Sequence, residues 1–250
     1  MPYNRGLLKE IQIVQDINGK TYDKLKNNLK ELMLCLYGII DEDEIFHCRK
    51  IEEFMKPDIV ITYKGIEKYI SIKTGRAQVI HQESIKSFIL FLRGLGISTK
   101  TQKTLLRYLY GDGTLDGSGK ERFDYHVIRV LLHKEIKEAN EELNGDKKIL
   151  AKVIERCLFI GNLECAIKID GVYFGDSRFG FLATINQIEK HIQRKNWDWM
   201  ENLHIDPLQI RPHARYVGKE IKNPKYRERL DVYWANLEQD LNYISTRYEP

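Results

Sequence analysis

Residues 56–75, KPDIVITYKGIEKYISIKTG, constrain the fold of this chain more than any other segment. Two stretches rich in β-branched and aromatic residues flank a short turn around Lys64 to Glu67, which is typical of paired antiparallel strands. Alternate residues of a strand share a face, so one side of the pair is apolar and should face a core: Ile59, Ile61, Ile70 and Ile72. The other side includes Asp58, Ser71 and Lys73. The segment therefore predicts a β-hairpin with polar residues near its open end.

Composition limits the class of protein. The chain has 250 residues, of which 42% are hydrophobic, so it can bury a substantial core. A net charge of +4 permits a polyanionic partner without requiring one. No apolar run is long enough to span a membrane, and the N-terminus lacks a signal-peptide pattern, so we expect a cytoplasmic protein without a membrane partner. The four cysteines form no C-x-x-C pair, which argues against a zinc site.

Periodicity and turn residues predict the other elements. Apolar spacing favours helices over about residues 21–37, 82–95, 125–143, 147–159, 184–193 and 226–243, and a glycine-rich loop over 110–122. A short strand, turn and strand are expected in 165–176. The predicted fold is α/β, with a mixed central sheet built around the hairpin, flanking helices and a mainly helical C-terminal elaboration. We expect a single domain over 1–250, with a core of about 20–96 and elaborations over about 97–250.

The polar residues of the hairpin suit one kind of chemistry. Asp58 begins one strand, Lys73 ends the next, and antiparallel pairing brings these two ends together. A carboxylate is a hard oxygen ligand for Mg²⁺, which lowers the pKa of a bound water and offsets the charge of a phosphodiester. A lysine can orient that water or stabilise the charged transition state. The pattern therefore indicates metal-dependent phosphodiester hydrolysis.

Pro57, Asp58 and Lys73 in this hairpin resemble the motif of the PD-(D/E)xK nuclease superfamily, which includes most restriction endonucleases. The 15 residues from Asp58 to Lys73 are within the range that the family uses. One position departs, because Ser71 stands where the family has Asp or Glu. The resemblance covers about residues 21–95. It implies a Mg²⁺-dependent endonuclease acting on double-stranded DNA, most simply a type II restriction endonuclease that works as a homodimer.

The family resemblance also suggests where the missing acid comes from. Some restriction endonucleases have Ser-x-Lys at this point and take a carboxylate from the following helix, which implies Glu83 here. Asp58 and Glu83 would then hold Mg²⁺, with Ser71 marking the vacated position. The family often adds a carboxylate upstream, and the sequence leaves three candidates open: Glu31, Glu52 and Glu53.

Basic and polar residues near the motif and late in the chain are candidate contacts to DNA: Arg76, His81, Gln82, Lys100, Lys103, Arg211 and Arg215. Three other interpretations of the chain stay open. A repair or recombination nuclease would share the chemistry, and a nuclease fold that has lost catalysis would be a DNA-binding module. A protein–protein scaffold would need neither activity, and Asp58 and Lys73 would then be an ordinary strand-start residue and a surface charge.

Overall fold

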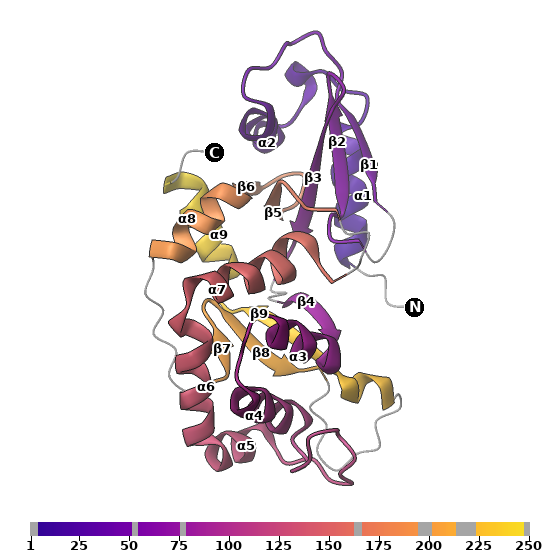
Figure 1. Ribbon diagram of the computed structural model, residues 1–250. Helices are drawn as coiled ribbons and strands as arrows, with labels where there is room; N and C mark the ends of the chain where they lie inside the picture. Colours follow the sequence, from indigo (N-terminus) through magenta and orange to yellow (C-terminus); the bar gives the residue numbers. More distant parts are fainter. Residues whose placement is uncertain are drawn as a thin grey trace. The chain divides into compact units, whose positions relative to one another are not determined.

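The computed structural model describes residues 5–51, 55–75, 79–162, 167–194, 202–213 and 224–247. The chain is a mixed α/β protein that divides into two compact units (Figure 1). The first unit draws on residues 1–77, 158–194 and 236–250, and the second on residues 78–157 and 195–235. Each unit therefore combines segments that are far apart in the sequence.

The first unit contains a five-stranded mixed sheet in the order β1-β2-β3-β5-β6. Its strands are β1 (His47–Lys50), β2 (Ile59–Tyr63), β3 (Ile66–Lys73), β5 (Gly171–Gly175) and β6 (Gly180–Thr184). Neighbouring strands run antiparallel except β3 and β5, which are parallel. The described helices of this unit are α1 (Arg5–Ile17), the 3₁₀ helix η1 (Tyr22–Lys24), α2 (Asn27–Tyr37), α8 (Ile185–Arg194) and α9 (Leu237–Arg247).

The predicted hairpin is confirmed. Strands β2 and β3 pair in a register that places Ile59 opposite Ile70. Lys64 and Gly65 form the turn, both with positive φ (48° and 77°), the conformation that two-residue hairpin turns require. The apolar side also faces the core as predicted, where it packs with Ile13 of α1 and with residues of α2. Figure 1 shows α1 running alongside β1 and β2.

The second unit contains an antiparallel sheet in the order β4-β9-β8-β7. Its strands are β4 (Val79–Ser84), β9 (Arg229–Trp234), β8 (Leu208–Pro212) and β7 (His204–Ile205). Its described helices are α3 (Ile85–Gly94), α4 (Thr99–Tyr110), α5 (Tyr125–Leu131), α6 (His133–Gly145), α7 (Lys147–Ile154) and the 3₁₀ helix η3 (Pro224–Glu228). A π-helical segment, η2 (Glu155–Ile160), continues α7.

Two of the predicted helices include residues that form strands. Residues 82–84 belong to strand β4, and helix α3 begins only at Ile85, where Ser84 accepts a capping bond from the N–H of Ser87. Residues 229–234 are strand β9, and the final helix begins at Leu237. In β9, apolar residues of the strand continue the helical stripe of α9. Residues 82–84 are Gln, Glu and Ser, so no apolar stripe marks them as helical. The C-terminal half is consequently richer in strands than predicted.

The predicted core of about residues 20–96 is divided between the two units, and the sheet that contains the hairpin takes two of its strands from residues 171–184. The prediction of a single domain stays a prediction. Within the described residues, no helix is both long and apolar enough to cross a membrane.

Candidate functional site

The motif residues lie at one end of the first unit's sheet. Because β1, β2 and β3 alternate in direction, the last residue of β1, the first of β2 and the last of β3 share this end. Asp58 directly precedes β2, and its N–H donates to the carbonyl of Ile70 at 2.9 Å. Its carbonyl accepts from the N–H of Ile51 at 3.0 Å. Asp58 is therefore fixed by backbone bonds to the strands on both sides.

The carboxylate of Asp58 is also held in place. The hydroxyl of Ser71 donates to its Oδ2 at 3.1 Å, and the N–H of Ile72 donates to the same oxygen. Ser71 is completely buried, so this bond is shielded from water. The residue at the departing motif position thus contacts the motif aspartate directly and orients it.

Lys73 ends β3 on the same side of the strand as Ser71, opposite Phe174 of β5. Its side chain is half-buried. With the residues that the structure describes, it makes no ion pair within 4 Å.

A second carboxylate approaches the motif from helix α1, where the sequence prediction did not place one. Glu10 is partly buried, and its Oε2 lies 3.4 Å from the Nζ of Lys50. Burial raises the pKa of Glu10, and the negative charge of Asp58 raises it further, while Lys50 and Lys73 act in the opposite direction. The charges of Asp58, Lys50 and Lys73 thus all act on Glu10, and we call these four residues the sheet-end cluster.

The donor set of this cluster suits Mg²⁺. Glu10 and Asp58 offer hard oxygen ligands, and one oxygen of Asp58 accepts both of the hydrogen bonds that position the carboxylate. No group of three or more His, Cys, Asp or Glu side chains arranged for a metal occurs among the described residues. Mg²⁺ is commonly held by one or two carboxylates, with water and substrate phosphate completing its shell, so two carboxylates are compatible with it.

Glu83, the predicted replacement acid, lies in strand β4 of the second unit rather than at the start of a helix. Its carboxylate is fully buried, and Arg156 donates a hydrogen bond to each oxygen, at 3.0 Å from Nε and 2.6 Å from Nη2. His81 lies 3.1 Å from one of them. Burial tends to raise the pKa of Glu83, but the bonds from His81 and Arg156 outweigh it and hold the pKa at about 2. Glu83 thus has its partners within its own unit.

The three upstream candidates are placed differently. Glu31 lies on the exposed side of α2, opposite the helix's apolar stripe as predicted. Glu52 and Glu53 lie outside the described residues. Glu10 could have been found from the sequence, because Ile13 and Ile17 follow it at helical spacing in 5–17, but that helix was not predicted.

The predicted DNA contacts fall mostly in the second unit. Gln82 of β4 and Arg211 of β8 both pair with Asp231 of β9, the strand that lies between them. Arg211 lies over the ring of Tyr233 at 4.4 Å. His81 is buried against Glu83.

The remaining predicted contacts are spread elsewhere. On α4, Lys100 pairs with Glu138 at 2.6 Å, and Lys103 is exposed. Arg76 and Arg215 lie outside the described residues. The structure thus brings Gln82 and Arg211 together but does not gather the whole predicted set.

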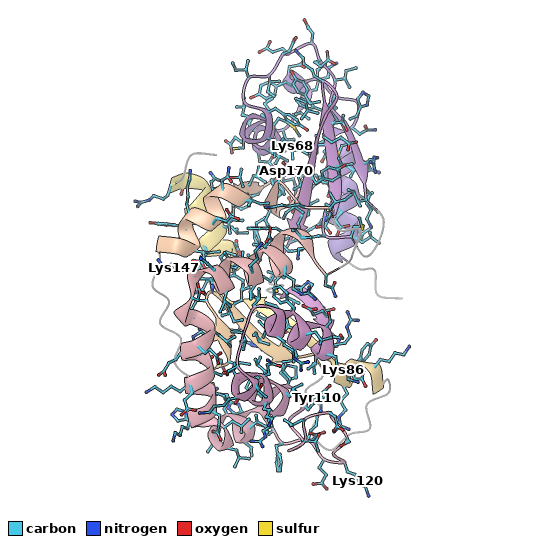
Figure 2. All side chains as sticks on the ribbon, in the orientation of Figure 1. Lys68, Lys86, Tyr110, Lys120, Lys147 and Asp170 are labelled. Atoms are coloured by element: carbon cyan, nitrogen blue, oxygen red, sulfur yellow. The ribbon has the colours of Figure 1, made fainter. Side chains whose placement is uncertain are left out.

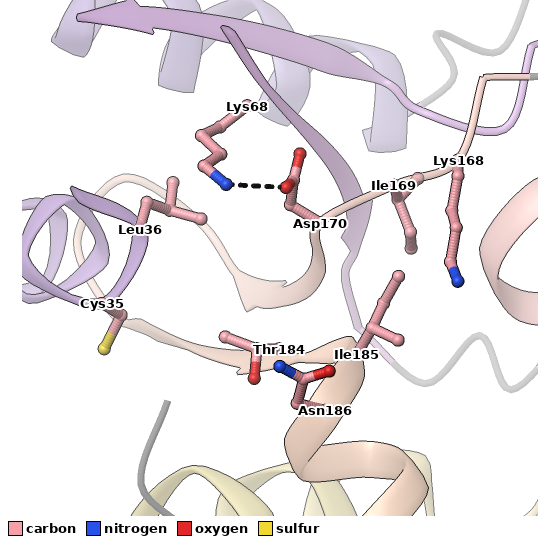
Figure 3. Close-up of a pocket in the computed structure, with 9 residues that line it drawn as sticks. All are labelled: Cys35, Leu36, Lys68, Lys168, Ile169, Asp170, Thr184, Ile185 and Asn186. Carbon is pink, nitrogen blue, oxygen red and sulfur yellow. Dashed lines mark hydrogen bonds and ion pairs between the residues drawn. The ribbon is translucent and has the colours of Figure 1, made fainter. Parts of the chain in front are cut away.

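A separate pocket of about 370 Å³ opens in the first unit, lined by residues of α2, β3, the start of α8 and the segment before β5 (Figure 3). Lys68 and Asp170, both labelled in Figure 2, form an ion pair of 2.9 Å across its wall. Asp170 also accepts from the N–H of Tyr69 at 2.8 Å. These bonds tie β3 to the segment leading into β5. None of the lining residues belongs to the sheet-end cluster, so this pocket is distinct from it.

Comparison with known proteins adds no family assignment, since no protein-family model matches the chain and no curated protein matches it significantly.

Proposed function

We propose that this chain is a Mg²⁺-dependent endonuclease of the PD-(D/E)xK type that hydrolyses phosphodiester bonds of double-stranded DNA, most simply as a type II restriction endonuclease. The observation that carries the proposal is the placement of Glu10, Asp58 and Lys73 at one end of a sheet whose central hairpin has the family's motif spacing. An acid and a lysine at strand ends, with a second acid from helix α1, are the side chains that this reaction needs.

Asp58 and Glu10 would hold the metal. Mg²⁺ in this place would lower the pKa of a bound water and offset the negative charge of the phosphate. Lys73, which has no ion-pair partner among the described residues, would donate to the attacking water and hold it against the phosphorus. Ser71 would keep the carboxylate of Asp58 in one orientation through its 3.1 Å bond. Glu10 thus takes the second acidic role that the sequence suggested for Glu83.

A homodimer follows from the restriction-enzyme proposal. A palindromic site has a twofold axis, and two copies of the sheet-end cluster related by the same axis would cut both strands. A repair nuclease that recognises DNA structure, or a DNA-binding module without catalysis, would share the fold but differ in what it does to plasmid DNA.

The test is incubation of purified protein with unmethylated plasmid and phage DNA, with Mg²⁺ and with EDTA, alongside Lys73→Ala. Discrete fragments that require Mg²⁺ and disappear in Lys73→Ala would support a restriction endonuclease. A smear with the same dependences would support a nuclease without tight sequence specificity. DNA binding without cleavage would contradict the proposed catalysis and favour the DNA-binding module.

A further inference from the structure

Lys50 belongs to the sheet-end cluster but to no part of the recognised motif. It is the last residue of β1 and pairs in register with Ile59, the residue directly after Asp58. Its Nζ lies 3.4 Å from Glu10, and its side chain is 33% exposed, so the ammonium also meets solvent. The strand ending and the contact to Glu10 together place this cation beside one of the two proposed acidic ligands.

The charges around it suit a phosphate. Glu10 and Asp58 would repel the negatively charged backbone of DNA, and the two ammonium groups of Lys50 and Lys73 balance them. An ammonium has three donors, so Lys50 can contact Glu10 and still donate to a second anion. Its flexible four-carbon stem lets the head group adjust when that anion arrives.

We propose that Lys50 binds a backbone phosphate of the DNA at the sheet-end cluster. This inference rests on the proposed nuclease function and adds a phosphate-binding residue that the motif does not include. Lys50 then acts on affinity and on the position of the DNA, while Lys73 acts on the attacking water.

Lys20 provides a matched control in the same unit. Its Nζ lies 3.6 Å from Asp16, another carboxylate of α1, and its side chain is 34% exposed. Asp16 has a second partner in Lys26, at 2.7 Å, and lies six residues along the helix from Glu10. Lys20 and Lys50 therefore make similar ion pairs with carboxylates of α1. They differ in that Lys50 pairs with Glu10 of the sheet-end cluster, whereas Lys20 pairs with Asp16, which is not part of the cluster.

The experiment measures equilibrium binding of a short DNA duplex in EDTA, as a function of salt concentration, for wild type, Lys50→Ala, Lys50→Arg and Lys20→Ala. Each phosphate contact contributes about 0.9 to the slope of log K against log salt. We expect the slope of Lys50→Ala to be smaller in magnitude than that of wild type by about 0.9. The slopes of Lys50→Arg and Lys20→Ala should equal that of wild type.

An unchanged slope in Lys50→Ala, or an equal loss in Lys20→Ala, would overturn the inference and make Lys50 only the ion-pair partner of Glu10. Mg²⁺-dependent cleavage by wild type, measured in parallel, separates this result from failure of the proposed function. Wild type that binds DNA with the expected slopes but never cleaves it would contradict the nuclease proposal and leave the phosphate contact standing. Wild type that does not bind DNA would contradict both.

Discussion

At the scale of single residues, Glu83 is a predicted site residue whose buried carboxylate is paired with an arginine of its own unit. A fully buried carboxylate is costly unless charged donors surround it, and Arg156 supplies two of them. We expect Arg156→Met to lower the free energy of unfolding by about 3 kcal/mol, because it leaves the charge of Glu83 buried with less compensation.

Urea denaturation would measure this loss. Lys152→Met is the matched control, since Lys152 pairs with Glu155 on the surface and its loss should lower the free energy of unfolding far less. A double variant, Glu83→Gln with Arg156→Met, should recover part of the loss because no charge remains buried. Equal effects of Arg156→Met and Lys152→Met would contradict this account.

Asp206 predicts a dependence of stability on pH. Burial raises its pKa from 3.8 to about 6, and its Oδ1 lies 3.4 Å from Nε2 of His204. Because folding raises the pKa of Asp206, the folded protein is most stable below the unfolded-state pKa of this carboxyl. This stability is lost as the pH rises through about 6. Asp206→Asn stays neutral, so at about pH 8 it should be more stable than wild type by about 2 kcal/mol, and near pH 4 about equal to it. Urea midpoints at both pH values would check this, and a difference independent of pH would refute it.

At the scale of elements, the hairpin depends on a turn in which two residues have positive φ. Gly65 adopts this conformation without strain and Lys64 does not, although Lys64 gains an exposed ion pair with Asp41. We expect Gly65→Ala to destabilise the protein by about 1 kcal/mol and Lys64→Asn to stabilise it by up to about 0.5 kcal/mol. Thermal unfolding of both variants should show shifts of opposite sign, and shifts of the same sign would show that this turn geometry is not what limits stability.

Local sequence pattern explains both the success of the hairpin prediction and the failure at β9. The hairpin combines alternating apolar residues with a turn signal, and each is specific to strands. In β9, Leu230 and Trp234 are buried by strand alternation, yet they also stand at helical spacing from Leu237 and Leu241 of α9. Local periodicity cannot separate a strand from the helix that follows when the two patterns coincide.

At the scale of the whole molecule, the first unit is assembled from three stretches of the chain. Strand β3 pairs with β5, about a hundred residues later, and nothing local in the sequence indicates that parallel pairing. For the same reason the sequence indicated the acid and lysine of the hairpin but not Glu10, since its electrostatic interaction with them exists only once α1 packs on the sheet.

This assembly predicts that the hairpin and its nearest elements are insufficient alone. A fragment ending at residue 157 keeps the whole motif but lacks β5, β6 and α9, so β3 loses its parallel neighbour. We expect this fragment to lack a cooperative unfolding transition by circular dichroism and to lack Mg²⁺-dependent cleavage. A cooperative, active fragment would show that residues 158–250 are dispensable for the site.

Whether the sheet-end cluster hydrolyses DNA is decided by comparing Mg²⁺-dependent cleavage of one duplex DNA by wild type, Glu10→Gln and Asp16→Asn. Both variants neutralise a lysine-paired carboxylate of α1 and keep its shape, but only Glu10 interacts with Asp58. The account predicts a loss of about 100-fold or more in the cleavage rate of Glu10→Gln and a change within about twofold for Asp16→Asn. Wild-type activity in Glu10→Gln, or no metal-dependent cleavage by wild type, would contradict the assignment of the sheet-end cluster as a nuclease site.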